Sequence, residues 1–233
     1  NFAPAHNNRA VALLAAGETA AALAGFDRSV ALDPGYAAAF NNRGVAHKNL
    51  GNTYLAAADF TRAIALDGEK TKPFVDRGLL RFETGNFARA ADNFAAATAT
   101  AANRDDSQPA LWALWAHMSR IRAGGDDAGH LKAFAAMTDW PGPLVALFMG
   151  DTTPDAVLAP YLEDDAEPDT QARLQAIFFA GQHRLISGDA EAAAELFWQV
   201  IQSGEVRTMA YAGARAELGR LGRLEPDQAP LAE

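Results

Sequence analysis

The side chains that could perform acid–base or metal chemistry are dispersed along this sequence. The histidines show no metal-ligand spacing such as HExxH, and they fall at His6, His47, His117, His130 and His183. The chain has no cysteine, which excludes disulfides, a thiol nucleophile and cysteine-based metal sites. No glycine-rich phosphate loop and no GxSxG motif is present. We therefore predict a protein without catalytic residues, bound metal or cofactor.

Adjacent carboxylates occur, but none is paired with a base or a nucleophile. Asp164 and Asp165 lie in the acidic stretch Glu163–Asp169, which we expect to be an exposed loop. The pairs at 105–106 and 126–127 are typical of helix N-caps rather than of catalytic acids. An enzyme with an unrecognised site in residues 103–233 is the less favoured alternative.

A period of about 34 residues organises the first hundred residues. Between Ala37 and Asp67 the sequence predicts two short helices, at about 37–50 and 53–66, which Gly51-Asn52 separates. Small residues beside a large aromatic residue would let the two helices approach closely. Similar residues recur 34 positions earlier and 34 positions later, and we call each such set of equivalent positions a column. The columns are Ala10, Gly44 and Gly78; Gly17, Gly51 and Gly85; Ala22, Ala56 and Ala90; Phe26, Phe60 and Phe94; Ser29, Ala63 and Ala97.

This pattern resembles the tetratricopeptide repeat, a helix–turn–helix unit of about 34 residues. The resemblance rests on the columns above and on Asp33-Pro34 at the end of the first unit. It implies an all-α protein, a right-handed superhelical stack of antiparallel helix hairpins. We predict three such repeats in residues 1–102, at about 3–34, 37–68 and 71–102.

The sequence of residues 103–233 predicts further helices, in which the repeat columns are only partly kept. We expect one hairpin at about 108–138, whose second helix lies near Ala128–Met137, and another at about 174–205. The later hairpin keeps four of the columns: Gly181, Gly188, Ala193 and Phe197. A final helix at about 206–222 would cover the open end of the stack.

The C-terminal half carries a second resemblance. Trp140-Pro141, the run Leu147–Gly150, the run Ile177–Gly181 and the run Ala194–Phe197 are similar to the bacterial tetratricopeptide-repeat lipoproteins typified by NlpI. That resemblance implies a dimeric adaptor at the outer membrane or in the periplasm, which holds peptidoglycan hydrolases next to a protease. The lipid-bearing cysteine of such a protein would lie upstream of Asn1. A cytoplasmic scaffold or co-chaperone-like protein of unknown client is the alternative.

The charge is unevenly distributed. Residues 1–102 carry a net charge of +1 and residues 103–233 a net charge of −10, within a total of −9. Nucleic acid is therefore not an expected partner, because phosphate binding needs clustered lysine and arginine. No apolar run reaches the roughly 18–20 residues that a membrane span requires. We expect a protein or peptide partner, and a homodimer is compatible with an apolar end of the stack.

The inner face of the stack is the predicted binding site. The first helix of each hairpin would line it with amides, lysines and apolar side chains, which suits a peptide backbone. With one tryptophan from the fourth hairpin, the predicted groove residues are Asn7, Val11, Asn41, Val45, Lys48, Asn49, Lys72, Val75, Leu79, Phe82 and Trp112.

Two further features of the repeats bear on binding. One subclass of these repeats grips a C-terminal carboxylate with five residues, of which only Asn42 and Lys72 are matched here. Asp76 would repel a carboxylate, so no such clamp is expected. Arginine occupies the seventh position of each repeat, at Arg9, Arg43 and Arg77. This column is either an anion-binding ladder or, as we favour, a set of structural ion pairs with carboxylates such as Asp59 or Asp92.

Three tryptophans are candidates for either core or surface. Aromatic residues at helical spacing more often belong to a core, and we assign Trp115 there. Trp112 and Trp140 are equally compatible with an exposed adhesive patch.

Overall fold

The computed structural model describes residues 2–102, 108–125, 128–161 and 170–224. These residues contain helices and no strand, which confirms the all-α prediction. The acidic stretch Glu163–Asp169 and the aspartate pairs at 105–106 and 126–127 lie outside the described residues. None of the described helices is both long and apolar enough to cross a membrane.

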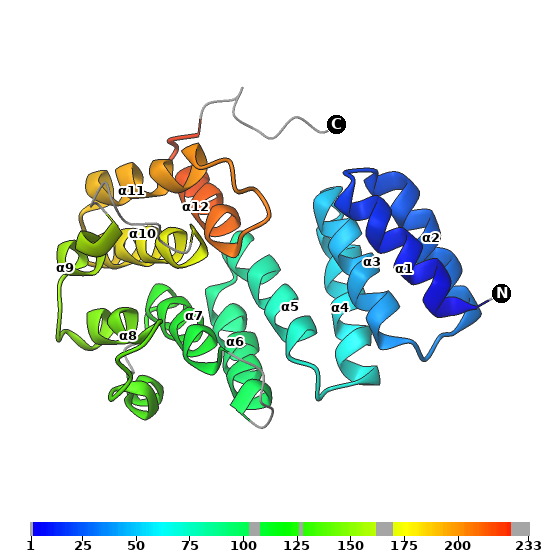
Figure 1. Ribbon diagram of the computed structural model, residues 1–233, viewed down its shortest axis with the longest axis horizontal. Coiled ribbons are helices and arrows are strands. Elements are labelled where there is room, and N and C mark those ends of the chain that lie inside the picture. The colour runs from blue at the N-terminus through cyan, green and yellow to red at the C-terminus, as the bar shows by residue number, and fades with distance from the viewer. Residues whose placement is uncertain (1, 103–107, 126–127, 162–169, 225–233) are drawn as a thin grey trace.

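The first six helices form three antiparallel hairpins, as the repeat predicts. The two helices of each hairpin pack closely together, and the second helix of each hairpin also packs against the first helix of the next. Figure 1 shows α1 to α4 together on one side of the molecule, with α5 and α6 in the middle. The bounds are α1 Ala3–Ala15, α2 Thr19–Leu32, α3 Ala37–Asn49, α4 Thr53–Leu66, α5 Thr71–Glu83 and α6 Phe87–Ala102.

Glycines account for both the turns and the close helix contacts. Gly51, in the turn column, has φ +75°, a left-handed conformation that strains any residue with a Cβ. Gly44 lies where α3 meets α4, and a Cβ there would be 2.7 Å from Cε1 of Phe60. Gly181 stands in the same relation to Phe197, again at 2.7 Å. The repeat columns therefore mark real contacts between paired helices.

The C-terminal half continues the stack less regularly. The expected helix near Ala128–Met137 is instead the six-residue 3₁₀ helix η1, with Leu131 as its buried residue. So short a segment, with one buried anchor, suits the tighter 3₁₀ turn. The remaining bounds are α7 Pro109–Arg122, η1 Gly129–Phe134, α8 Gly142–Met149, α9 Pro154–Leu158, η2 Ala159–Tyr161, α10 Thr170–Ile186, α11 Ala190–Gln202 and α12 Met209–Arg220.

The last helix packs differently from the expected end cover. It begins at Met209 rather than near Val206, and it lies against α5 as well as α10 and α11 (Figure 1). Gly213 permits a close approach of α12 to α10 and α7, because a Cβ there would lie 2.6 Å from Phe178 and 3.1 Å from Trp115. The last helix therefore covers part of the third repeat.

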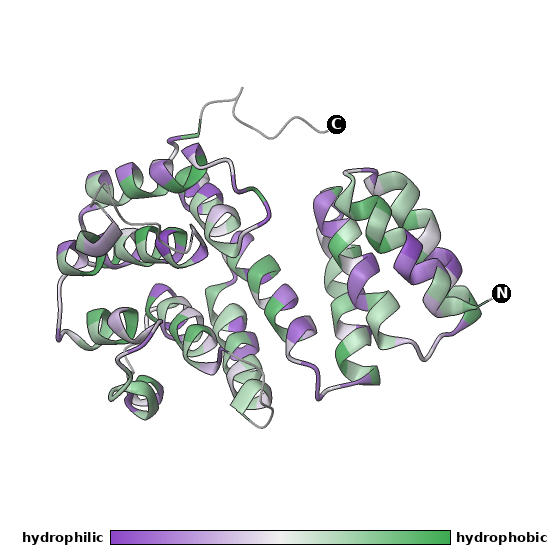
Figure 2. Cartoon of the chain, in the orientation of Figure 1, coloured by the Kyte–Doolittle hydropathy of each residue, from purple (hydrophilic) through white to green (hydrophobic). Residues whose placement is uncertain are grey.

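The apolar core is concentrated in the C-terminal two-thirds of the molecule. The main cluster runs from Val75 to Leu218 and surrounds Trp115, whose ring contacts Phe82, Phe94 and Phe178. The first two repeats contain only small clusters, around Phe26 and around Phe60. Figure 2 shows both hydrophobic and hydrophilic residues on the helices, as expected for amphipathic elements. The assignment of Trp115 to the core is confirmed.

Candidate functional site

The inner helices α1, α3 and α5 are joined by a ladder of side-chain hydrogen bonds. Asn42 donates to Asn7 at 2.9 Å, and Asn41 donates to Asp76 at 2.9 Å. Lys48 forms an ion pair with Glu83 at 3.0 Å. Each bond joins residues 35 apart, which is one repeat plus one residue. Several of the predicted groove residues therefore bond to the next inner helix.

The predicted groove residues differ widely in exposure. Val75, Leu79 and Phe82 are buried in the main core. Val11 is 42% exposed, Asn49 is exposed and Val45 is half-buried. Lys72 is exposed and pairs with Asp76 at 2.7 Å, and Asp76 also accepts a hydrogen bond from Asn41. The binding role assigned to this set remains a prediction.

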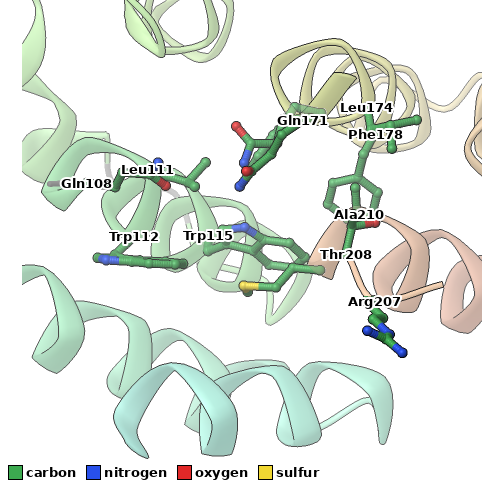
Figure 3. Close-up of a pocket in the computed structure, with 13 residues that line it drawn as sticks. Gln108, Leu111, Trp112, Trp115, Gln171, Leu174, Phe178, Arg207, Thr208 and Ala210 are labelled. Carbon is green, nitrogen blue, oxygen red and sulfur yellow. The ribbon is translucent and has the colours of Figure 1, made fainter. Parts of the chain in front are cut away.

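A pocket of about 240 Å³ lies between α7, α10 and the start of α12 (Figure 3). Its buried wall is apolar and comes from Leu111 and Trp115 on α7 and from Leu174 and Phe178 on α10. The half-buried Trp112, one of the predicted site residues, also lines it. The half-buried Met209 also lines the pocket, and the remaining, more exposed lining is polar: Gln108, Gln171, Gln175, Arg207 and Thr208.

The polar lining is partly oriented by neighbouring groups. Trp140 donates its indole N–H to Oε1 of Gln175 at 2.9 Å, which fixes the position of that amide. Thr208 caps α12 by accepting a hydrogen bond from the backbone N–H of Tyr211. Arg207 donates to the carbonyl of Ala15, which ties this edge of the pocket to the end of α1. Among the described residues, the side chains that line the pocket offer hydrogen bonds and apolar contact, and none of them is a histidine, cysteine or carboxylate.

A buried ion cluster holds the three pocket-forming helices together. Glu217 of α12 is fully buried and accepts hydrogen bonds from Arg122 of α7 at 2.5 Å, from Arg220 at 3.0 Å and from Gln182 of α10 at 3.2 Å. Burial raises the pKa of Glu217, but the hydrogen bonds and charges of Arg220 and Arg122 outweigh it and leave the pKa below its ordinary value. The carboxylate is therefore ionised at neutral pH.

The same cluster ties α12 to the third repeat. Arg220 donates to the carbonyls of Phe82 and Glu83, at the end of α5, at 3.2 and 3.3 Å. A cation at a helix C-terminus is favourable because the carbonyl ends of the helix carry partial negative charge. The guanidinium of Arg220 also lies 5.0 Å from the ring centroid of Phe87. The helices that form the pocket are thus fixed to the third repeat.

The arginine column is structural in the second repeat, as we favoured. Arg43 makes two hydrogen bonds to Asp59, at 2.7 and 2.8 Å, and one to Asp27 at 2.9 Å. The hydrogen bonds that Arg43 donates to Asp59 raise the pKa of Arg43 despite its partial burial. Arg77 departs from the expected pattern, because its acceptors are Asn93 and Thr61 instead of carboxylates. Arg9 is exposed.

The rings of two histidines, His117 and His183, lie beside the ring of Phe148, and His130 lies next to His117. The rings of His117 and His130 are 5.3 Å apart, and those of His117 and His183 are each within 6 Å of the Phe148 ring. Burial and the nearby Arg184 lower the pKa of His183. No three histidine, cysteine, aspartate or glutamate side chains among the described residues could hold a metal ion together.

Sequence reasoning identified Trp112 but missed most of the other pocket residues. The glutamines and Arg207 lie near the starts of three helices that are far apart in sequence. They belong to no column of the repeat, and their spacing gives no local signal. Trp140, which the sequence assigns to neither core nor surface, is half-buried and orients Gln175.

This chain is similar to solved structures of tetratricopeptide repeat proteins. The chain resembles the crystal structure of such a protein from Parabacteroides merdae, with a TM-score of 0.56 and 17% sequence identity over 93% of this chain and 84% of that chain. The corresponding domain of P58(IPK) gives a TM-score of 0.44 and 21% identity over 95% and 69% of the two chains. Neither a protein-family model nor a curated protein matches the sequence. The first likeness establishes the fold class, an all-α solenoid of helical hairpins.

Proposed function

We propose that this protein is a non-catalytic adaptor that binds an extended segment of a partner protein. The observation that carries the proposal is the pocket between α7, α10 and α12, which combines a buried apolar wall with an amide-rich mouth. Side-chain amides can both donate to and accept from a peptide backbone. The part of the lining that the structure describes consists of apolar, amide, hydroxyl and guanidinium groups, which suits binding better than acid–base catalysis.

The size of the pocket suits one side chain of the partner. A volume of about 240 Å³ is smaller than the several hundred Å³ typical of a pocket for a whole small ligand. An apolar side chain would pack against Trp115 and Phe178, while the flanking peptide groups would bond to Gln108 and Gln171. Trp112 would cover the inserted side chain, as aromatic residues commonly do at the centre of an interface.

The cellular setting extends this proposal and rests on sequence resemblance alone. The similarity of the segments Trp140–Gly150 and Ile177–Phe197 to envelope lipoproteins supports a dimeric adaptor that organises peptidoglycan hydrolases or proteases. Sedimentation of the purified chain tests the dimer, and cell fractionation of the natural protein tests the location. A monomer at micromolar concentration, or recovery only in the cytosol, would contradict this extension while leaving the pocket proposal intact.

A displayed peptide library tests the binding site directly. We expect selection on the purified protein to yield peptides that share one bulky apolar residue. The selected peptides should bind the Trp112→Ala variant at least about tenfold more weakly, because truncating a central aromatic residue commonly costs that much. Affinity is measured by fluorescence polarisation with labelled peptides.

The matched control is Leu55→Ala, which removes a 47% exposed apolar side chain from α4, away from the pocket. This variant should bind the selected peptides like the unmodified protein. If the Trp112→Ala variant, with an unchanged circular-dichroism spectrum, binds them equally well, the pocket is not the binding site. Hydrolysis of the selected peptides by the protein would contradict the adaptor role.

A further inference from the structure

The second and third repeats place the same arginine in the same position but surround it with different acceptors. Arg43 and Arg77 are one period apart, and each reaches between the second helices of two successive hairpins. For Arg43 the acceptors lie 16 residues to either side, at Asp27 and Asp59. For Arg77 the same intervals lead to Thr61 and Asn93. The third repeat therefore keeps the positions of the arginine and its two acceptors, but the acceptors are neutral where the second repeat has two carboxylates.

Within the described part of the chain, the positive charge of the Arg77 guanidinium is consequently not balanced by a bonded carboxylate, and not all of its N–H groups are used. Its Nε donates to Asn93 at 2.8 Å and its Nη1 to Thr61 at 3.0 Å, while its Nη2 has no hydrogen-bond acceptor among the described residues. In the second repeat the corresponding Nη2 binds a carboxylate oxygen of Asp59 at 2.7 Å. Burial, together with the nearby Arg81, lowers the pKa of Arg77 to about 10.

The neighbouring charges on α5 and α6 are also mainly positive. Arg81 follows Arg77 by one helical turn. Burial lowers the pKa of Arg81, and the nearby charge of Arg89 lowers it further. Asp92 offsets part of this effect on Arg81. Arg81 donates to the backbone carbonyl of Arg89 rather than to a carboxylate. An approaching anion therefore meets a cationic group along this side of the third repeat.

Apolar surface adjoins this cationic group on α4. Thr61, which accepts from Arg77, also lines an open hollow with Tyr54, Ala58 and Arg62. Tyr54 is 84% exposed, an unusually high value for a large aromatic side chain. The hollow can accommodate an apolar side chain next to a carboxylate held by the arginine.

We propose that this outer surface, formed by Arg77, Arg81 and Arg89 beside Tyr54 and Thr61, docks an acidic segment of a partner protein through a carboxylate bound to Arg77. The second repeat supplies the reason for choosing a carboxylate, since Asp27 and Asp59 fill the equivalent places there. This surface is separate from the pocket between α7, α10 and α12, so it adds a second contact to the adaptor.

The test uses the arginine side-chain Nε–H signals in a ¹H–¹⁵N spectrum of the full chain. The titrant is a seven-residue capped peptide with a central glutamate between two leucines, and the matched peptide has glutamine instead. The Arg77 signal is assigned by its loss in an Arg77→Lys variant. We expect a saturable shift with the glutamate peptide and none with the glutamine peptide at equal ionic strength.

The Asn93→Asp variant is the decisive control, because it restores the carboxylate that the second repeat has at this place. The variant loses the hydrogen bond that Asn93 donates to the carbonyl of Arg89, so its fold is first checked by circular dichroism. It should bind the glutamate peptide at least about tenfold more weakly, since a charge-assisted bond to Arg77 is then satisfied internally. Equal binding by this variant would overturn the proposal, as would the absence of any shift. Sodium phosphate is titrated in parallel, and an equal shift would show a general anion site and so overturn the acidic-segment assignment.

Discussion

Removing the charge of Glu217 should loosen the pocket-forming helices without altering their shape. In the Glu217→Gln variant the side chain keeps its size, but Arg122 and Arg220 lose the buried carboxylate that accepts their hydrogen bonds. Breaking a buried pair by removing one partner costs about 3–5 kcal/mol. The two arginine side chains are 18% and 26% exposed, so water partly compensates them. We therefore expect a loss of about 2–3 kcal/mol in the free energy of unfolding.

Urea denaturation followed by tryptophan fluorescence measures this loss. All four tryptophans lie between Trp112 and Trp198, so the signal reports the C-terminal half that contains the cluster. Glu191→Gln is the matched control, because Glu191 pairs with Arg223 on the surface and is 68% exposed. An exposed pair of this kind contributes at most about 1 kcal/mol, so the control should change little.

The pH dependence separates lost charge from altered packing. The pKa of Glu217 is lowered from its ordinary value of 4.5, so the folded state binds fewer protons than the unfolded state just below that pH. Its contribution is therefore fully present above pH 4.5 and is lost as the pH falls towards the folded pKa. The stability difference between wild type and Glu217→Gln should be constant near neutrality and shrink below pH 4.5. A difference that is unchanged at acid pH would refute this explanation.

Three further substitutions test the repeat contacts. Gly44→Leu should unfold or separate the first repeats, since even a Cβ would lie 2.7 Å from Phe60; a normal circular-dichroism melt would contradict the column assignment. Asp59→Asn should cost about 2 kcal/mol in urea denaturation because it breaks the paired bonds to Arg43. Gly213→Ala should detach α12, which protease cleavage near Val206 would detect; wild-type resistance would mean that Trp115 and Phe178 can move aside.

Local spacing explains which features the sequence could predict. The turn at Gly51 and the contact of Gly44 with Phe60 involve residues within one hairpin, so a fixed interval encodes them. The ladder between inner helices also follows one interval, because neighbouring repeats are related by the same displacement. The predicted binding role for the residues of this ladder is untested, and their mutual hydrogen bonds show that residue type at a groove position does not establish availability.

The candidate pocket could be predicted only in part. Trp112 is among the binding residues predicted from the sequence, and the structure places it in the pocket lining. Gln108, Gln171 and Arg207 gave no signal, because each looks like an ordinary polar residue near the start of a helix. Their proximity depends on how α10 and α12 fold back against α7.

The repeating pattern of residues is enough to predict the helices, turns and hairpin stacking of the first three repeats, since these depend on contacts that recur at short, regular intervals. The tertiary structure alone decided that α12 lies against α5 and that Glu217 joins three helices. Glu217 is 95 residues from Arg122, and Arg220 is 138 residues from Phe82. Contacts at such separations occur once and leave no periodic trace, because they are selected by the burial of one particular surface against another.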